Sequence, residues 1–177
     1  MDESIRSKIA KITTLVLDVD GVLTDGKIIV ADNGMETKNF CVRDGHGLRL
    51  LGRSGVEIML LTGRYSELVS FRARDLEIKE VHQKIFNKLE TFIEIAARKN
   101  ISLTEVAFIG DDVIDVPLLR RVGFSAAPND AIDEVKAVVD YVASKNGGNG
   151  AVREICEMIL KGKNLWGEVI ARYDLKE

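Results

Sequence analysis

This chain has few cysteines and a small net charge. Only two cysteines, Cys41 and Cys156, occur among the 177 residues. This number argues against a disulfide framework, so a reducing, cytoplasmic compartment is the default expectation. The formal net charge is only −3, which gives no reason to expect a nucleic-acid partner or an anionic membrane surface. The apolar runs, such as residues 56–61, are far too short to cross a bilayer.

Internal repeats and long low-complexity stretches are lacking as well. Hydrophobic residues make up 46% of the chain and charged residues 30%, a balance typical of a globular protein. A chain of 177 residues is long enough for one domain with a proper core and too short for two. We therefore expect residues 1–177 to form a single domain.

Short apolar runs rich in β-branched residues alternate along the chain with segments of helical spacing. The clearest helical pattern covers residues 87–99, where the apolar residues form one stripe. Such alternation predicts an α/β fold, with a largely parallel sheet and helices on both faces. Ligands of such sheets bind beyond the carboxyl ends of the strands. The expected strands are residues 14–19, 57–61, 106–109, 123–126 and 141–143, and the expected helices are residues 1–11, 66–76, 87–99, 116–122, 131–139 and 151–160.

One segment breaks this alternation just after the first strand. Residues 27–31 and 35–40 flank Asp32-Asn33-Gly34, which is a hairpin turn signal, so we expect a β-hairpin that leaves the sheet. The glycine-rich residues 147–150 predict a flexible joint before the last helix. The tail, residues 161–177, has weak periodicity and is compatible with either a docked or a disordered segment.

Two aspartates follow the first expected strand. Asp18 and Asp20 are spaced so that both carboxylates can point into one crevice, and Gly21 lets the chain turn sharply there. Taken alone, this pattern is equally compatible with a solvated loop of turn-forming aspartates.

A second acidic cluster follows the strand at residues 106–109. Asp111 and Asp112 come directly after it, and Asp115 is nearby. Because the ends of parallel strands lie side by side, we expect this cluster to face the first one. Crowded carboxylates repel each other unless protons or a cation intervene, and such oxygen-rich sites suit Mg²⁺. A solvated acidic rim is the alternative.

The strand at residues 57–61 ends in Thr62-Gly63-Arg64. A hydroxyl, an accessible N–H and a helix N-terminus together can hold a phosphate group, although Thr62 could instead be the N-cap of the next helix. Lys88 stands in the first turn of the strongest helix, where it is poorly placed against the helix dipole. That position favours another role, such as holding phosphate, although most lysines are simply solvated.

The order of these motifs resembles the haloacid dehalogenase superfamily. The resemblance rests on the segments from Asp18 to Thr24 and from Thr62 to Arg64, on Lys88, and on the segment from Gly110 to Asp115. It implies a Rossmann-like parallel sheet flanked by helices, together with hydrolysis of a phosphate ester.

More closely, the chain is similar to 3-deoxy-D-manno-octulosonate 8-phosphate phosphatases over roughly residues 10–160. It departs from that subfamily at His46, where an aromatic residue is usual, and at Asn149, where arginine is usual. The resemblance implies a sugar-acid phosphate as substrate and a place in lipopolysaccharide biosynthesis. The shared positions are Asp25-Gly26, Asn33-Gly34, Lys38, Phe40, Arg43-Asp44-Gly45, Gly47, Gly123 and residues 150–154.

The resemblance also implies a role for each motif. Asp18 would be the nucleophile that forms an aspartyl phosphate, and Asp20 would be the general acid and base. Mg²⁺ would be held by Asp18, by the backbone carbonyl of Asp20 and by Asp111. Thr62, the Gly63 N–H and Lys88 would neutralise the phosphoryl oxygens.

The spacing of the motifs leaves no room for an inserted cap domain, because only one helix and one short strand fit between Thr62 and Lys88. The site should therefore be open within one subunit. By resemblance we expect a homotetramer assembled through the hairpin, whose strand edges are exposed. The resemblance also implies contacts with the substrate, some of them across the subunit boundary. The candidate substrate-binding residues are Asp20, Cys41, Val42, Arg43, Asp44, Gly45, Arg49, Gly63, Arg64, Arg72 and Lys88.

Arginine suits this role because its guanidinium grips a carboxylate with two parallel hydrogen bonds. Arg64 and Arg72 are eight residues apart, so we expect them to share one helix face. Alternatively, these arginines pair with neighbouring acids such as Asp75.

Three other functions compete with this hypothesis. The chain could be a phosphatase for a related nonulosonate phosphate or for a broader set of sugar phosphates. A phospho-receiver domain also uses Asp, Thr and Lys with Mg²⁺, but it carries its paired acids early in the chain and its phosphorylated Asp in the middle. An inactive scaffold would not need the complete set of Asp18, Asp20, Thr62, Lys88 and Asp111.

Overall fold

A six-stranded parallel sheet forms the centre of the protein. In the computed structural model, which describes residues 2–175, the strand order is β5-β4-β1-β6-β7-β8. The central strand β1 (Thr14–Leu17) pairs in parallel with β4 (Glu57–Leu61) and with β6 (Val106–Ile109). This arrangement confirms the predicted α/β fold. The outer strands are β5 (Glu80–His82), β7 (Phe124–Ala127) and β8 (Tyr141–Val142).

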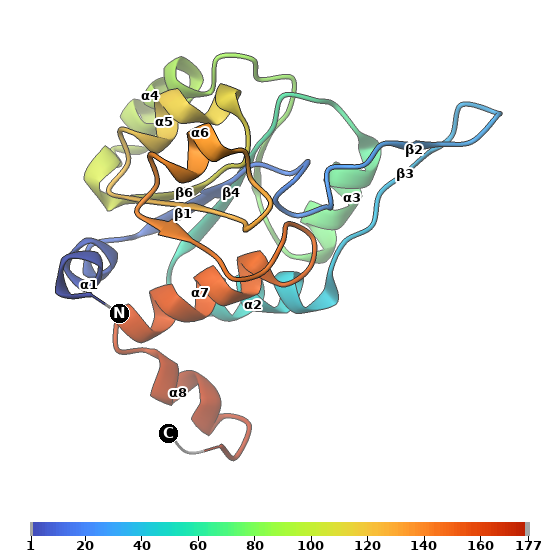
Figure 1. The fold of residues 1–177 in the computed structure, drawn as a ribbon. Helices are drawn as coiled ribbons and strands as arrows, with labels where there is room; N and C mark the ends of the chain where they lie inside the picture. Colours follow the sequence, from blue (N-terminus) through green and yellow to red (C-terminus); the bar gives the residue numbers. More distant parts are fainter. Residues whose placement is uncertain (1, 176–177) are drawn as a thin grey trace.

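Helices cover both faces of this sheet (Figure 1). Successive β1 side chains face opposite sides, so Leu15 and Leu17 belong to one buried cluster and Val16 to the other. The first cluster includes residues of α1 (Glu3–Ala10), α2 (Val42–Arg53), α3 (Glu67–Asp75), α7 (Ala151–Gly162) and α8 (Trp166–Ala171). The second includes residues of α4 (Lys88–Lys99), α5 (Val116–Leu119) and α6 (Asp133–Lys136), and the short 3₁₀ helices η1 (Leu103–Glu105) and η2 (Val113–Asp115) complete the fold.

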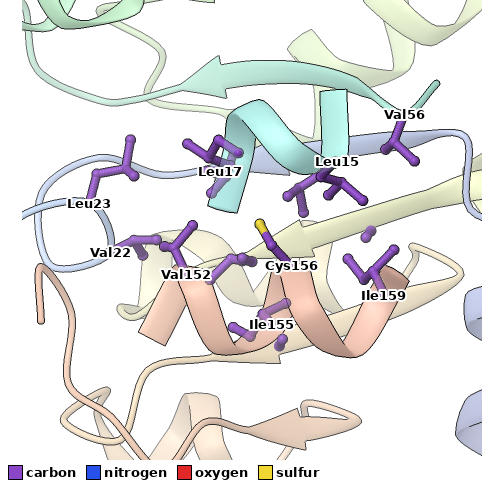
Figure 2. Packing of buried hydrophobic residues seen from close by; sticks show 14 of the residues in the cluster. Leu15, Leu17, Val22, Leu23, Val56, Val152, Ile155, Cys156 and Ile159 are labelled. Carbon is purple, nitrogen blue, oxygen red and sulfur yellow. The ribbon is translucent and has the colours of Figure 1, made fainter. Parts of the chain in front are cut away.

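The packing between β1 and α7 illustrates the larger core. Val152, Ile155 and Ile159 lie on one face of α7 and are completely buried. Figure 2 shows them beneath Leu15 and Leu17 of β1. Burying one such aliphatic side chain contributes about 1.5–3 kcal/mol, so this contact anchors the strand from which Asp18 emerges.

The sequence patterns did not predict α2. Its segment contains Gly45 and Gly47, and glycine disfavours the interior of a helix. The structure explains both residues by close packing. A Cβ at Gly45 would overlap the guanidinium of Arg72, and one at Gly47 would lie 3.1 Å from the Arg153 Cα. Contacts with α3 and α7 therefore outweigh the low helix propensity of this segment.

The other elements differ from the predictions mainly in length. The helices expected at residues 116–122 and 131–139 shorten to α5 and α6, each of four residues. The tail is docked, because Val169 of α8 belongs to the first cluster and Ile170 is also buried; residues 176–177 lie outside the described range.

The predicted hairpin is present and consists of β2 (Ile29–Val30) and β3 (Glu36–Thr37). It projects away from the sheet beyond α3 (Figure 1). Its apolar residues Ile28, Ile29, Val30 and Met35 are exposed. Among the residues described, no helix combines the length and the apolar character needed to span a bilayer.

Candidate active site

The sheet register brings three loops to one edge. Leu17 of β1 is paired with Leu60 of β4 and with Ile109 of β6, so the three central strands end at nearly the same level. The Asp18 N–H still donates to the Ile109 carbonyl at 3.0 Å. The residues that follow these strands therefore meet at the carboxyl edge, as the sequence predicted.

A cavity of about 180 Å³ lies at this edge. Seven of the predicted site residues contribute to its wall, together with Asp112 and Ile114. Its lining thus combines carboxylates with a hydroxyl, a lysine and an arginine. The seven predicted residues are Asp18, Asp20, Thr62, Gly63, Arg64, Lys88 and Asp111.

Lys88 is a fully buried cation at the floor of the cavity, with 1% of its side chain exposed. Asn87 caps α4 by accepting the Glu90 N–H at 3.2 Å, which places Lys88 in the first turn, as expected. Its Nζ lies 2.9 Å from Asp18 Oδ2 and 2.5 Å from Asp115 Oδ1. Burial lowers the pKa of Lys88, but the two carboxylates outweigh burial and raise that pKa above its usual value. The lysine is therefore held in its charged form.

Asp18 is also buried, and its two oxygens have different partners. Oδ1 accepts the Val19 N–H at 2.7 Å, whereas Oδ2 faces Lys88. Burial raises the pKa of Asp18 to about 6 even though Lys88 lowers it. A carboxylate held in this way between a backbone donor and a lysine has a defined orientation.

Asp111 gives the clearest indication of a cation site. Its Oδ1 is buried and has no hydrogen-bond partner among residues 2–175. Burial, together with the charges of Asp18 and Asp115, raises the pKa of Asp111 to about 8. Carboxylate oxygens of Asp18, Asp111 and Asp115 lie within 4.8 Å of one another. A hard divalent cation such as Mg²⁺ fits this donor set, because it would offset the repulsion and take the unpartnered oxygen.

Asp115 was noted in the sequence as a neighbour but was given no role. It is completely buried, and all its contacts are internal. Besides its ion pair with Lys88, it accepts hydrogen bonds from the backbone N–H groups of Asp111 at 3.0 Å and Asp112 at 3.3 Å. Asp115 therefore holds Lys88 and the turn that carries Asp111. Its position four residues after Asp111, where it can cap that turn, was the signal that could have identified it.

Thr62, Gly63 and Arg64, the segment expected to hold a phosphate group, line the cavity, but two interpretations of this segment are wrong. Helix α3 begins at Glu67 with Ser66 as its N-cap, so Thr62 is not the cap. Arg64 precedes the helix and therefore does not share a helix face with Arg72. Thr62 continues the pairing with β5, because its N–H donates to the His82 carbonyl at 2.9 Å, and the chain bends at Gly63 and Arg64 before the helix begins.

A chain of charges links the hairpin to the cavity. Lys38, which follows β3, pairs with the carboxylate of Asp20. The same Nζ lies 3.2 Å from Glu36 Oε1, and Glu36 Oε2 lies 3.5 Å from Arg64. The side chain of Lys38 is only 1% exposed. In the sequence, Lys38 is indicated only by the resemblance to the phosphatase subfamily.

The remaining predicted substrate-binding residues do not line the cavity of a single chain. Arg49 lies on a different hollow, between α2, β4 and the end of α3. Arg72 pairs with Asp75 at 2.6 Å and donates to the Cys41 carbonyl at 3.3 Å. Asp44 is buried and accepts the Arg153 N–H at 2.8 Å, so it caps α7. The residues outside the cavity wall are Cys41, Val42, Arg43, Asp44, Gly45, Arg49 and Arg72.

Comparison with known proteins agrees with this geometry. A family model described as haloacid dehalogenase-like hydrolase matches residues 58–155. The chain is 43% identical to the 3-deoxy-D-manno-octulosonate 8-phosphate phosphatase KdsC of Escherichia coli K12 over 154 residues, which cover 87% of this chain and 82% of the relative. The corresponding protein of Yersinia pestis is 40% identical over 158 residues, covering 89% and 84%.

Solved structures give the same result. The 3-deoxy-D-manno-octulosonate 8-phosphate phosphatase of Moraxella catarrhalis, solved with magnesium, phosphate and KDO, superposes with a TM-score of 0.95 at 40% identity, over 98% of this chain and 99% of that one. The cobalt-bound phosphatase of Haemophilus influenzae gives a TM-score of 0.86 at 36% identity, over 90% and 94%. The chain therefore belongs to the haloacid dehalogenase-like hydrolases and, within them, to the family of 3-deoxy-D-manno-octulosonate 8-phosphate phosphatases.

Proposed function

We propose that this protein is a Mg²⁺-dependent phosphatase that hydrolyses 3-deoxy-D-manno-octulosonate 8-phosphate to the sugar acid and phosphate. The observation that carries this proposal is the joint placement of Asp18, Asp111 and Lys88 on one small cavity. Similarity to phosphatases of that substrate along most of the chain supports the choice of sugar acid.

Asp18 is the proposed nucleophile. One of its oxygens attacks phosphorus, the bond from phosphorus to the sugar oxygen breaks, and an aspartyl phosphate forms on Asp18. A carboxylate that attacks a phosphate dianion meets charge repulsion. Lys88, fixed 2.9 Å from Asp18 Oδ2, offsets this repulsion from the floor of the cavity.

Asp20 is the proposed proton carrier. It gives a proton to the leaving sugar oxygen and then takes one from the water that attacks the aspartyl phosphate, which releases phosphate and restores Asp18. Thr62, the Gly63 N–H and Lys88 face the phosphoryl oxygens as charge spreads over them.

Asp18, Asp111 and the backbone carbonyl of Asp20 are the proposed Mg²⁺ ligands. When bound, the ion supplies positive charge to the transferring phosphoryl group. Asp112 lines the same cavity and would orient the site from outside the ligand set.

We further propose that substrate recognition is completed by a second subunit of a homotetramer. The exposed apolar residues Ile28, Ile29 and Val30 of the hairpin supply a surface for assembly. Arg64 lies on the cavity, whereas Cys41, Val42, Arg43, Asp44, Gly45, Arg49 and Arg72 lie outside it and would contribute only by support or across a subunit boundary. Light scattering at micromolar concentration distinguishes a tetramer from a monomer.

We also infer a cytoplasmic setting. The basis is that Cys41 and Cys156 are free thiols, in keeping with a reducing compartment.

The function is tested by phosphate release from a matched set of substrates. The set contains 3-deoxy-D-manno-octulosonate 8-phosphate, a related nonulosonate phosphate and a hexose phosphate that lacks a carboxylate. Each is assayed with Mg²⁺ and with a chelator. We expect the highest kcat/KM for the first substrate, loss of turnover on chelation and loss in Asp18→Asn. Equal kcat/KM for all three substrates, or full activity in excess chelator, would contradict the proposal.

A further inference from the structure

Lys38 is a buried cation that the proposed reaction does not yet use. It comes directly after β3, in the segment that returns from the exposed hairpin, and its side chain is 1% exposed. A buried charge is costly unless it is paired. Lys38 has two acidic partners, Asp20 and Glu36. Through Asp20, the lysine at the base of the hairpin contacts the proposed active site.

Lys38 is the hydrogen-bond donor to the carboxylate of Asp20. Within residues 2–175, the one hydrogen bond recorded for the Asp20 carboxylate comes from Lys38 Nζ. Lys38 does not belong to the wall of the cavity, whereas Asp20 does. The lysine therefore contacts the proposed proton carrier without itself lining the cavity.

Lys38 also forms an ion pair with Glu36. Glu36 lies two residues earlier and places Oε1 at 3.2 Å from Lys38 Nζ. Its Oε2 lies 3.5 Å from Arg64, which stands in the turn after β4 on the cavity wall. The series Asp20, Lys38, Glu36 and Arg64 thus begins and ends at residues that line the cavity and passes through the base of the hairpin.

We propose that Lys38 is a positioning residue that holds the carboxylate of Asp20 in line with the leaving oxygen, and that Glu36 keeps Lys38 in place. This inference rests on the proposed role of Asp20. Proton transfer requires the carboxyl group within hydrogen-bond reach of the reacting oxygen. Without Lys38, the Asp20 side chain would rotate among its rotamers and spend only part of its time there.

The test uses leaving groups of graded acidity. A sugar alkoxide needs a proton as it leaves, whereas p-nitrophenolate leaves without one. We expect Lys38→Met to lower kcat/KM for the sugar-acid phosphate by about 100-fold, a typical contribution of general acid catalysis, and for p-nitrophenyl phosphate by less than about 5-fold. A series of substituted phenyl phosphates should show a steeper dependence on leaving-group acidity in Lys38→Met than in the wild type.

Lys99→Met is the matched control. Lys99 also bridges two carboxylates, Glu57 at 2.8 Å and Glu80 at 3.0 Å, but it lies at the far end of α4. Lys99→Met should leave the leaving-group dependence unchanged.

Lys38→Arg keeps a cation and should recover part of the activity on the sugar-acid phosphate. Glu36→Gln provides a milder variant and should shift the dependence in the same direction as Lys38→Met.

A double-mutant comparison separates positioning from a general structural effect. If Lys38 acts through Asp20, adding Lys38→Met to Asp20→Asn should cost almost nothing further. An active wild type whose leaving-group dependence is unchanged in both Lys38→Met and Glu36→Gln would overturn the inference. Additive losses in the double variant would also overturn it. A wild type without phosphatase activity would instead overturn the proposed function.

Discussion

Asp115 holds Lys88 by an ion pair that joins Nζ to Oδ1 at 2.5 Å in a site from which solvent is excluded. The other oxygen of Asp115 accepts two backbone N–H groups, those of Asp111 and Asp112. One side chain therefore fixes both the lysine and the turn that carries a proposed metal ligand.

We expect Asp115→Ala to damage stability and activity together. The variant leaves Lys88 with one partner and two backbone donors without an acceptor. Breaking a buried pair from one side typically costs about 3–5 kcal/mol. Urea unfolding measures the loss. Asp133→Ala, which removes an almost fully exposed aspartate from α6, is the control and should be nearly neutral. A stability loss below about 1 kcal/mol for Asp115→Ala would contradict this view of the site.

Gly21→Ala should impair Mg²⁺ binding beyond its effect on the backbone. Gly21 has a φ of +91°, and a Cβ there would overlap Asp111 Oδ2. Gly55 has nearly the same φ, +92°, but a Cβ would find nothing within 4 Å. Both alanine variants should lose about 1–3 kcal/mol from backbone strain. Only Gly21→Ala should lose Mg²⁺ affinity, as measured by calorimetric titration. Equal Mg²⁺ affinities in the two variants would show that the clash is relieved without moving Asp111.

The metal-free protein should lose stability as the pH rises. Burial raises the pKa of Asp18 to about 6 and that of Asp111 to about 8, against 3.8 for an ordinary aspartate. The folded state therefore binds more protons than the unfolded state between about pH 4 and 8, so the free energy of unfolding falls across that window. Mg²⁺ binds the ionised carboxylates, so it should stabilise most near pH 8.

Thermal melts in chelator and in Mg²⁺ from pH 5 to pH 8 measure this linkage. Asp111→Asn is the control and should flatten the dependence in chelator. A metal-free melting temperature that rises with pH over this range would contradict the assigned pKa shifts.

Much of this site could be predicted from the sequence because strand ends in a parallel sheet converge. Asp18, Thr62 and Asp111 follow predicted strands and are expected at one edge on that rule, whereas Lys88 is indicated by its place in the first turn of a helix. All four line the cavity. Helix α2 could not be predicted, because its glycines are selected by contacts with Arg72 and Arg153 that no local pattern reveals.

The ion pairs of the site were equally hidden. Lys38 and Asp20 are 18 residues apart, and Lys88 and Asp115 are 27 apart. Spacing along the chain does not reveal which side chains meet at such separations. The prediction about the arginines failed for a local reason: α3 begins at Glu67, close to the expected start, so Arg64 lies outside the helix and shares no helix face with Arg72.

Arg64 and Arg72 should differ in their effect on substrate preference. Arg64 lines the cavity, whereas Arg72 is tied to Asp75, the Cys41 carbonyl and the face of Phe40. We expect Arg64→Ala to raise KM for the sugar-acid phosphate much more than for p-nitrophenyl phosphate, because only the acid loses a carboxylate partner. Steady-state kinetics on the two substrates measures the difference.

Arg72→Ala should destabilise the protein, because it removes the hydrogen bond from Arg72 to the carbonyl of Cys41, the N-cap residue of α2. A preference for the sugar acid that survives Arg64→Ala unchanged would assign carboxylate recognition to other residues, such as Arg43 or Arg49.

Asp18 is the proposed carrier of the phosphoryl group, and borohydride trapping tests this role most directly. Asp20→Asn should slow hydrolysis of the intermediate, and p-nitrophenyl phosphate can still form that intermediate because its leaving group needs no proton. The variant is therefore mixed with Mg²⁺ and p-nitrophenyl phosphate, quenched, reduced and mapped by mass spectrometry. An acyl phosphate at Asp18 would be reduced to homoserine at that position, and the modification should be absent in chelator and in an Asp18→Asn enzyme. Phosphate release by the wild type together with an unmodified residue 18, or with the modification at another aspartate, would contradict the account.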